Sequence, residues 1–431
     1  MTSVPAETPA KLNRREVFAW AMYDWANSAY STLSITILVF YIKEVVVPGR
    51  LGTVVWAWGI SLSMLTAAVL SPILGAMADA NAGKRRWLAV TALSGAGCAV
   101  LLAFVPPQSA WLVISLFVVT CLMFELSLGF YNGFLPEIAG EKDLNRVSAW
   151  GYALGYLGGA LALLLALGVK IFGESLGLPE VSDQLRAGIL IMGLWWGLFT
   201  LPTIWILRDR GIAPENKLPP IKAISQAIGE VGHTLRNIRL YKTLSLFLLA
   251  FLFYNDGIQS VISQSSTFAI DVLSFSVGEL IILILVIQLV ALPGALLVGR
   301  LADWIGQKPT LVGCLAVWIA LIIAAYHITS KPQFWVLGVV LAFVMGGTQS
   351  ISRAIMGLMT PVSRSAEFFG FFNFSGKATS FLGTFLFGLI IAQTGDPRLA
   401  ILSLLVFFLV GWGIVASINI QKGRREAIES Q

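Results

Sequence analysis

Long apolar runs separated by short polar segments recur along the entire chain. Each run is long enough to cross a bilayer as a helix, because about 20 apolar residues span a hydrocarbon core of roughly 30 Å. Open strands are excluded as spanning elements, because lipid cannot hydrogen-bond their free backbone groups. Twelve runs can be marked, at approximately residues 17–42, 53–78, 87–105, 110–135, 147–172, 187–207, 241–268, 277–299, 310–328, 333–358, 367–392 and 399–419. We therefore expect an all-α membrane protein with 12 transmembrane helices.

Basic residues are concentrated in alternate loops. With this number of spans, both termini lie on the same side as the loops after spans 2, 4, 6, 8 and 10, and that side carries 21 of the 29 Lys and Arg residues. The opposite side carries 6, and Arg353 and Lys377 fall inside spans. Because positively charged loops remain in the cytoplasm, both termini are predicted to be cytoplasmic, in a plasma membrane such as the bacterial inner membrane.

The longest loop, residues 208–240, divides the spans into two sets of six. It predicts an N-terminal six-helix bundle at residues 1–207 and a C-terminal six-helix bundle at residues 241–431. Apolar residues spaced by threes and fours within the loop are Ile221, Ile224, Ile228, Val231, Leu235 and Ile238. This spacing is typical of an amphipathic helix. We expect that helix to lie on the cytoplasmic leaflet, as a linker or as a regulatory element.

The composition is that of a chain solvated largely by lipid. Hydrophobic residues make up 57% of 431 positions and charged residues 12%, whereas soluble proteins carry roughly 25% charged residues. The net charge of +6 does not indicate a nucleic-acid partner, because no basic stripe is interleaved with aromatic residues on a soluble domain. The bilayer is the partner that the composition predicts, and nucleic acid is excluded.

Residues that suggest other chemistry do not match the patterns which that chemistry requires. Cys98, Cys121 and Cys314 lie in separate apolar runs without metal-ligand spacing. Residues 370–378 have the wrong glycine spacing for a phosphate-binding loop and end in Ala378 where Ser or Thr is required. We therefore expect no metal, no cofactor and no nucleotide, so that a solute or proton gradient must drive any transport.

The two halves repeat one pattern at the loop after their second span. The first copy has Gly75, Asp79, Gly83 and the basic run Lys84, Arg85 and Arg86. The second copy has Gly299, Asp303, Gly306 and Lys308. A glycine permits close helix contact, and an aspartate at a helix end can meet a cation or a helix terminus across the loop.

This repeated loop resembles the signature loop of the major facilitator superfamily, glycine-x-x-x-aspartate followed by glycine and basic residues. The resemblance implies that Gly75, Asp79, Gly83 and Arg85, with their counterparts in the second half, hold the cytoplasmic ends of neighbouring helices together and bias the conformational switch. The second copy differs at Gln307, which replaces a basic residue, and the first has one extra residue before Gly83.

The first span narrows the resemblance. Residues 23–30 read YDWANSAY, which is similar to the tyrosine-aspartate-tryptophan-alanine-asparagine-serine run of the vacuolar effluxer-like branch of the superfamily. The resemblance extends over all the spans and includes Tyr254, Asn255 and Asp256. Fungal members are described as exporting amino acids from the vacuole, so the resemblance implies amino-acid efflux by analogy.

Ionisable residues inside apolar spans are expensive and therefore candidate sites. They are Asp24, Glu125, Asp256, Arg353 and Lys377. In the major facilitator fold, spans 1, 4, 7 and 10 line the central cavity and span 11 flanks it, so the resemblance places all five near that cavity. One interpretation gives the acids to a substrate amine or a proton and the bases to a substrate carboxylate. The alternative is internal pairing that holds helices together.

Neutral polar residues share these spans, and we assign Asn27 and Asn255 to the cavity. A second set, Gly151, Gly155, Gly158 and Gly159, forms a smooth face on span 5. Small residues of this kind allow helices to pack closely or to slide. The mixed charges and amides suit a zwitterion better than a sugar or a hydrophobic drug.

The leading hypothesis is a monomeric secondary transporter that moves a small solute by alternating access around a midplane site. The solute is an amino acid by analogy, and a proton is a candidate coupling ion. Transport of another organic solute, such as a sugar or drug, and a non-transporting sensor or scaffold are the alternatives. An enzyme acting on lipids is disfavoured, because no nucleophile, base or metal-ligand constellation is present.

Overall fold

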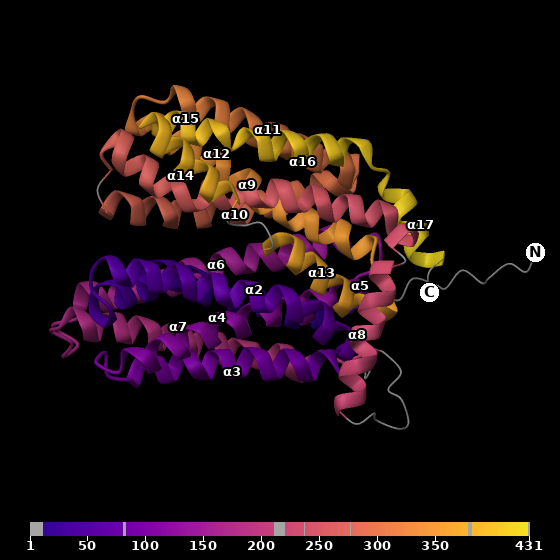
Figure 1. Ribbon diagram of the computed structural model, residues 1–431, viewed down its shortest axis with the longest axis horizontal. Coiled ribbons are helices and arrows are strands. Elements are labelled where there is room, and N and C mark those ends of the chain that lie inside the picture. Colours follow the sequence, from indigo (N-terminus) through magenta and orange to yellow (C-terminus); the bar gives the residue numbers. More distant parts are fainter. Residues whose placement is uncertain are drawn as a thin grey trace, which may run out of the picture.

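The computed structural model describes residues 12–80, 83–210, 220–236, 238–275, 277–377 and 382–429. It contains 12 helical segments long and apolar enough to cross a membrane, as the hydrophobic pattern predicts. Figure 1 shows them as two helical bundles lying side by side, with α8 across one end of the molecule. The all-α prediction is confirmed.

The N-terminal half contains the first six spans. Its helices are α1 (Arg14–Leu33), α2 (Arg50–Ala80), α3 (Lys84–Phe104), α4 (Ala110–Gly133), α5 (Leu135–Ile138), α6 (Leu144–Phe172) and α7 (Val181–Ile206). The first span continues beyond α1 through two π-helical segments, η1 (Ser34–Leu38) and η2 (Tyr41–Val46). The first span is therefore longer than the sequence predicts.

The C-terminal half contains the other six spans. Its helices are α9 (Lys242–Leu273), α10 (Val277–Ile305), α11 (Gln307–His327), α12 (Lys331–Leu358), α13 (Ser365–Lys377), α14 (Leu382–Thr394), α15 (Pro397–Ser403) and α16 (Leu405–Ser417). Short elements outside the spans are α8 (Pro220–Arg236), η3 (Ile238–Tyr241), η4 (Val362–Arg364) and α17 (Ile420–Glu429). Span 11, predicted as one helix, consists of α13 and α14 with residues 378–381 between them, outside the described part of the chain.

One end of the molecule gathers both terminal helices, and we call it the termini side. Glu16 in the first turn of α1 pairs with Arg210 at 2.6 Å, and Arg424 of α17 pairs with Glu141 at 2.5 Å. The loops after spans 2, 4, 6, 8 and 10 reach this same end. It is the side that the basic residues predict to be cytoplasmic.

The interface between the halves follows the internal repeat. Helix α2 packs on α13, and its counterpart α10 packs on α6. Likewise α4 contacts α13, and its counterpart α12 contacts α6. The spans in the second contact of each pair are six positions along the chain from those in the first, so spans 2 and 11 correspond to spans 8 and 5. The two halves are therefore related by a pseudo-twofold axis that passes between these helix pairs.

The glycines predicted to form a smooth face on span 5 lie against α1. A Cβ added at Gly158 would lie 2.6 Å from the Trp25 carbonyl oxygen, and one at Gly155 would lie 2.8 Å from Ser28 Oγ. No larger residue fits at this separation, so the glycines set how closely α6 approaches α1. This close approach positions the polar face of α1.

Helix α8 corresponds to the predicted amphipathic helix. It packs against α2 with Ala227 buried, while Ile224 and Ile228 remain exposed. The side chains of Ile221, Leu235 and Ile238, which belong to the predicted stripe, lie outside the described residues. Its position beside a membrane leaflet remains a prediction.

Candidate functional site

Four of the five predicted intramembrane charges form two ion pairs, and each pair joins one half to the other. Asp24 of α1 lies 2.9 Å from Arg353 of α12. Glu125 of α4 lies 3.2 Å from Lys377 of α13. A charge inside a membrane protein is stabilised by a partner of opposite sign. In this conformation both pairs therefore join the two halves within the spans.

The guanidinium of Arg353 is hydrogen-bonded almost entirely by the opposite half. Its Nε donates to Ser148 Oγ at 3.0 Å, and its Nη2 donates to the Ser148 carbonyl at 2.8 Å. Its Nη1 lies 3.3 Å from Asn132 Oδ1 in addition to the Asp24 carboxylate. The Arg353 side chain is 2% exposed. A planar guanidinium suits this arrangement because its donors form a fixed fork.

Aromatic rings enclose the same guanidinium. Its central carbon lies 4.1 Å from the ring centre of Tyr152, 4.6 Å from that of Trp20 and 5.7 Å from that of Tyr131. Such contacts are favourable when the cation is desolvated. We call the enclosing residues the Arg353 cage: Asp24, Trp20, Tyr131, Asn132, Ser148 and Tyr152.

Gly151 completes the packing of this cage. A Cβ added there would lie 2.3 Å from Asp24 Oδ2 and 2.6 Å from Arg353 Nη2. Only a residue without a side chain leaves room for the ion pair. The predicted glycine face thus serves the charged site as well as helix packing.

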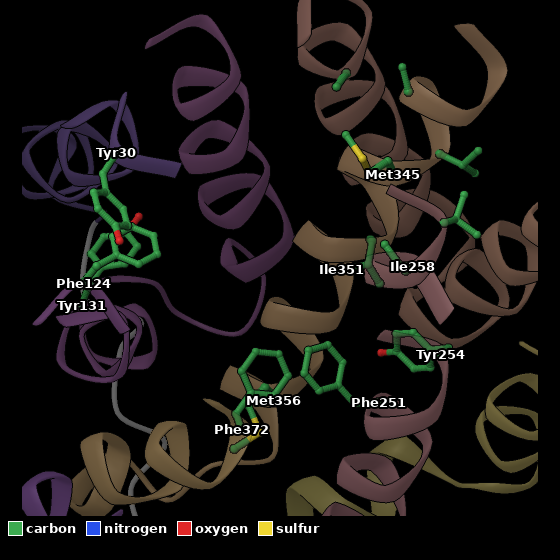
Figure 2. Packing of buried hydrophobic residues seen from close by; sticks show 14 of the residues in the cluster. Tyr30, Phe124, Tyr131, Phe251, Tyr254, Ile258, Met345, Ile351, Met356 and Phe372 are labelled. Atoms are coloured by element: carbon green, nitrogen blue, oxygen red, sulfur yellow. The ribbon is translucent and has the colours of Figure 1, made fainter. Parts of the chain in front are cut away.

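The second ion pair is less enclosed. The Lys377 side chain is 24% exposed, although its partner Glu125 is only 5% exposed. Aromatic residues of the two halves form separate groups, with Tyr30 and Phe124 in one and Phe251 and Phe372 in the other (Figure 2). Their ring centres are 4.4 Å and 4.1 Å apart within each group. The lysine of this pair is therefore partly exposed, in contrast to the enclosed guanidinium of Arg353.

Asn255 and Asp256 of α9 contact span 11 on either side of residues 378–381, which lie outside the described part of the chain. Asn255 Nδ2 donates to the Gly376 carbonyl at 2.9 Å, in α13. Asp256 Oδ2 accepts from the Gly383 amide at 2.9 Å, in α14. The two side chains thus join α9 to the backbone of span 11. Asp256 is not paired with a cation among the described residues.

Asn27, the remaining residue assigned to the cavity, lies in α1 one turn beyond Asp24. Its side chain is buried, and its Nδ2 has no hydrogen-bond partner among the described residues. A buried donor without a partner costs free energy. Asn27 is therefore available for a hydrogen bond that this conformation does not supply.

The first repeated loop closes the termini side between the halves. The Asp79 carboxylate accepts from the amides of Ala366 and Glu367 at 3.2 and 2.9 Å, in the first turn of α13. It also lies 3.3 Å from Lys84, which pairs with Glu137 as well. A carboxylate is stabilised at a helix N-terminus, where backbone amides are free. A Cβ at Gly75 would lie 2.4 Å from the Ala366 carbonyl oxygen, so this glycine permits the approach.

The second repeated loop uses a different set of contacts. Asp303 accepts from Asn145 Nδ2 at 2.9 Å, and Asn145 Oδ1 accepts from Gln307 at 2.7 Å. A Cβ at Gly299 would lie 2.6 Å from Ala149. Gly306 has a φ of +97°, which favours glycine. Here hydrogen bonds between neutral amides and one carboxylate replace the ion pair of the first loop.

The other predicted loop residues lie beside these contacts. Gly83 precedes α3, and the Arg85 amide donates to Asp209 at 3.0 Å while its side chain is exposed. Lys308 lies in the first turn of α11 and is partly exposed. Lys84, the neighbour of the predicted Arg85, is therefore the basic residue beside Asp79.

A cavity of about 370 Å³ also opens at the termini side, where α8 meets both halves. Arg364 pairs with Glu367 at 2.7 Å, and Thr234 of α8 donates to Glu367 at 2.7 Å. Residues lining the cavity are Asp79, Ala80, Glu230, His233, Ser363, Arg364 and Glu367. The linker helix is thus attached to the same end of α13 that Asp79 caps.

Several residues of these sites were not predicted. They are Trp20, Tyr131, Glu137, Asn145, Ser148, Tyr152 and Glu367. The spacing of Asn145, Ser148 and Tyr152 was an available signal, because residues three or four apart share one face of a helix. Over the residues that the structure describes, no group of three or more His, Cys, Asp or Glu residues is arranged to hold a metal ion.

Solved structures with the same arrangement of helices are membrane transporters. The proton:xylose symporter XylE superimposes with a TM-score of 0.73 at 12% identity, covering 96% of this chain and 98% of the other. The human organic anion transporter MFSD10 gives a TM-score of 0.72 at 14% identity, covering 93% and 99%. At these identities the likeness establishes the major facilitator fold and carries no information about the solute.

Relatives in sequence are closer. An uncharacterised MFS-type transporter of Bacillus subtilis, YxiO, is 32% identical over 404 residues, which cover 92% of this chain and 93% of the relative. Autophagy-related protein 22 of Cryptococcus neoformans is 30% identical over 304 residues, 66% of this chain and 52% of that protein, so the match spans about half of the fungal relative. The family model described as vacuole effluxer Atg22 like matches residues 55–145 and 141–428. The chain therefore belongs to the Atg22-like vacuole effluxer family of the major facilitator superfamily.

Proposed function

We propose that this chain is a secondary active transporter of small zwitterionic solutes, amino acids among them, which works by alternating access between its two halves. The observation that carries the proposal is that two ion pairs within the spans join one half to the other. Such pairs can break and re-form when a charged solute enters between the halves. The family's vacuole effluxer description and the transporter fold support movement of a small solute across the membrane.

In this proposal the Glu125–Lys377 pair is the solute site. A zwitterion carries an ammonium that can replace Lys377 beside Glu125, and a carboxylate that can replace Glu125 beside Lys377. The net charge of the site stays constant during this exchange, which limits the cost of burying the solute. We assign Asn27 and the aromatic groups of Figure 2 to contacts with its uncharged parts.

The Asp24–Arg353 pair has a different role. Because its guanidinium has four polar contacts and is enclosed by aromatic rings, we assign it to holding the conformation that is closed at the termini side. The Asp79 and Asp303 contacts support the same closed end. The bias of basic residues supports a cytoplasmic position for that end. In this conformation the proposed monomer is therefore open on the side away from the cytoplasm.

The proposal is tested by counterflow in proteoliposomes. Purified protein is reconstituted with a high internal concentration of each of the amino acids in turn, and entry of the same labelled amino acid is measured. We expect saturable entry for at least one. No saturable entry of any amino acid into liposomes with folded protein contradicts the proposed solute class.

A matched pair of variants then tests the site. Lys377→Gln should reduce counterflow at least about tenfold, corresponding to roughly 1.4 kcal/mol of lost stabilisation. Lys331→Gln removes a Lys–Glu pair of similar length, 2.8 Å to Glu279, that lies within one half. The control should keep its counterflow within about twofold, and equal losses in both variants would remove Lys377 from the solute site.

A further inference from the structure

We infer that Asp256 carries a proton during the transport cycle, at a site separate from the two ion pairs. The inference rests on the proposed function, since the proton is assigned as the coupling ion of that transporter. The Asp256 carboxylate is buried and only partly hydrogen-bonded. Asp256 is 1% exposed, and only its Oδ2 has a partner, the Gly383 amide at 2.9 Å. Its Oδ1 is buried and has no hydrogen-bond partner among the described residues.

A second buried oxygen lies at the same place. Ser260 follows Asp256 by one turn of α9, is fully buried, and its Oγ has no partner among the described residues. A Cβ added at Gly383 would overlap Ser260 Oγ and lie 3.4 Å from Asp256 Oδ2. The Ser260 hydroxyl and the Asp256 carboxylate therefore both lie beside the first turn of α14.

Charged groups on the elements around α9 are occupied elsewhere. Helices α12, α13, α14, α15, α16 and α17 and the turn η3 contact α9. Titratable side chains on these elements that have described partners contact groups other than Asp256. Within the spans the pairs are Arg353 with Asp24, Lys377 with Glu125, Lys331 with Glu279 and Arg398 with the Tyr326 carbonyl. At the termini side they are Glu367 with Arg364, Tyr241 with Arg364, Arg424 with Glu141 and Glu426 with Thr243. On α9 itself, Tyr254 is hydrogen-bonded to Ser352. Over the described residues, Asp256 is left as the intramembrane carboxylate without a cation.

The chemistry of the site favours a proton over a metal cation. An isolated buried carboxylate is costly, and one proton neutralises it. Hard metal cations take about six or more oxygen ligands, whereas the described residues offer two free oxygens. When the proton binds, an O–H bond forms at Oδ1 and the carboxylate becomes neutral. When it leaves to water in another conformation, that bond breaks and the carboxylate is restored, so no oxidant or second reactant is needed.

The site lies close to the solute site along α9. Asn255, the neighbour of Asp256, donates to the Gly376 carbonyl, and Lys377 follows directly in the chain. Asp256 accepts from the Gly383 amide in α14. Adding or removing a proton at Asp256 therefore changes the charge next to Asn255, which contacts the residue beside Lys377, the partner of Glu125.

Proton binding can be measured without knowing the solute. In an unbuffered titration of purified protein between about pH 5 and 9, Asp256→Asn should take up roughly one proton fewer than the unmodified protein. Asp396→Asn is the control, because this loop carboxylate caps α15 and Asn caps helices equally well. Asp256→Glu should restore the proton, and it serves as the test if the amide variant does not fold. Equal uptake by the unmodified protein and Asp256→Asn would overturn the inference.

Coupling is then measured in proteoliposomes with the amino acids that show counterflow. A gradient of about one pH unit should raise accumulation up to roughly tenfold at one proton per solute. Asp256→Asn should lose this stimulation to a much greater degree than it loses counterflow, while Asp396→Asn keeps both. Stimulation by a Na⁺ gradient instead of a pH gradient, or equal loss of counterflow and stimulation in Asp256→Asn, would overturn the inference. Absence of counterflow in the unmodified protein would contradict the proposed function, and the titration would still decide whether Asp256 holds a proton.

Discussion

The two ion pairs between the halves differ in how completely the protein satisfies their charges. Arg353 receives a carboxylate, two serine contacts, an amide and three aromatic rings, and its side chain is 2% exposed. Lys377 has Glu125 at 3.2 Å and remains 24% exposed. A fully enclosed charge is suited to fixing a conformation, whereas a partly open one can exchange its partner. Similar residue types thus serve different purposes because their surroundings differ.

The largest expected effect comes from breaking the enclosed pair. Arg353→Met leaves the Asp24 carboxylate buried without its cation, and removal of one member of a buried pair costs about 3–5 kcal/mol. We expect a large fall in the free energy of unfolding, measured by thermal or chemical denaturation in detergent. A fall as small as that caused by Lys377→Gln would show that the two pairs are equivalent.

Removing both members of that pair sharpens the same test. Asp24→Asn combined with Arg353→Met leaves no buried charge, and apolar or neutral replacement of a buried pair is often close to neutral in stability. We expect the double variant to recover at least about half of the stability lost in Arg353→Met. Lack of recovery would mean that contacts with Ser148, Asn132 and the rings, and not the Asp24 charge, dominate the Arg353 cage.

Gly151→Ala strains the enclosed pair without changing a charge. Its methyl group would meet Asp24 Oδ2 and Arg353 Nη2, and overpacking of this kind costs about 1–3 kcal/mol. Gly97→Ala is the control, because a Cβ there meets nothing within 4 Å and alanine stabilises a helix by about 0.5–1 kcal/mol relative to glycine. Denaturation midpoints should move in opposite directions, and a shared direction would argue against close packing around the ion pair.

Lys377→Gln should lower stability less than Arg353→Met does. Lys377 is 24% exposed and Arg353 2%, so fewer buried contacts are lost with the lysine, and we expect a smaller shift of the denaturation midpoint while counterflow falls. At the Glu125–Lys377 pair we therefore expect transport to fall more than stability, whereas at the Asp24–Arg353 pair we expect both to fall. A large loss of stability in folded Lys377→Gln would place Lys377 with Arg353 as a residue that maintains the conformation.

The hydrophobic pattern was sufficient to predict the spans, because about 20 apolar residues in succession can hardly be anything else in a lipid bilayer. The repeated glycine and aspartate loops likewise pointed to the termini side, where the structure has Asp79 and Asp303 between the halves. The contacts of Asn255 and Asp256 with the backbone of span 11 were not predicted, because the sequence does not fix how α9 is rotated toward that span.

The partners of the intramembrane charges could not be derived from the sequence. Pairing depends on how each helix is rotated about its axis, and several charged spans could have been rotated to other partners. For the same reason, the sequence does not show that Lys84, and not Arg85, is the basic residue beside Asp79. Three basic residues stand in succession, and only the start of α3 decides which of them points toward Asp79 and Glu137.

The placement of Arg353 has a consequence for the unloaded protein. Its backbone belongs to one half while its side chain is gripped by the other, so the halves cannot part at that depth without withdrawing a cation from three rings and four oxygens. In the proposed transport cycle, the change between conformations should therefore be slow when no solute is bound. A slow return of the empty transporter limits the dissipation of the gradient that drives transport.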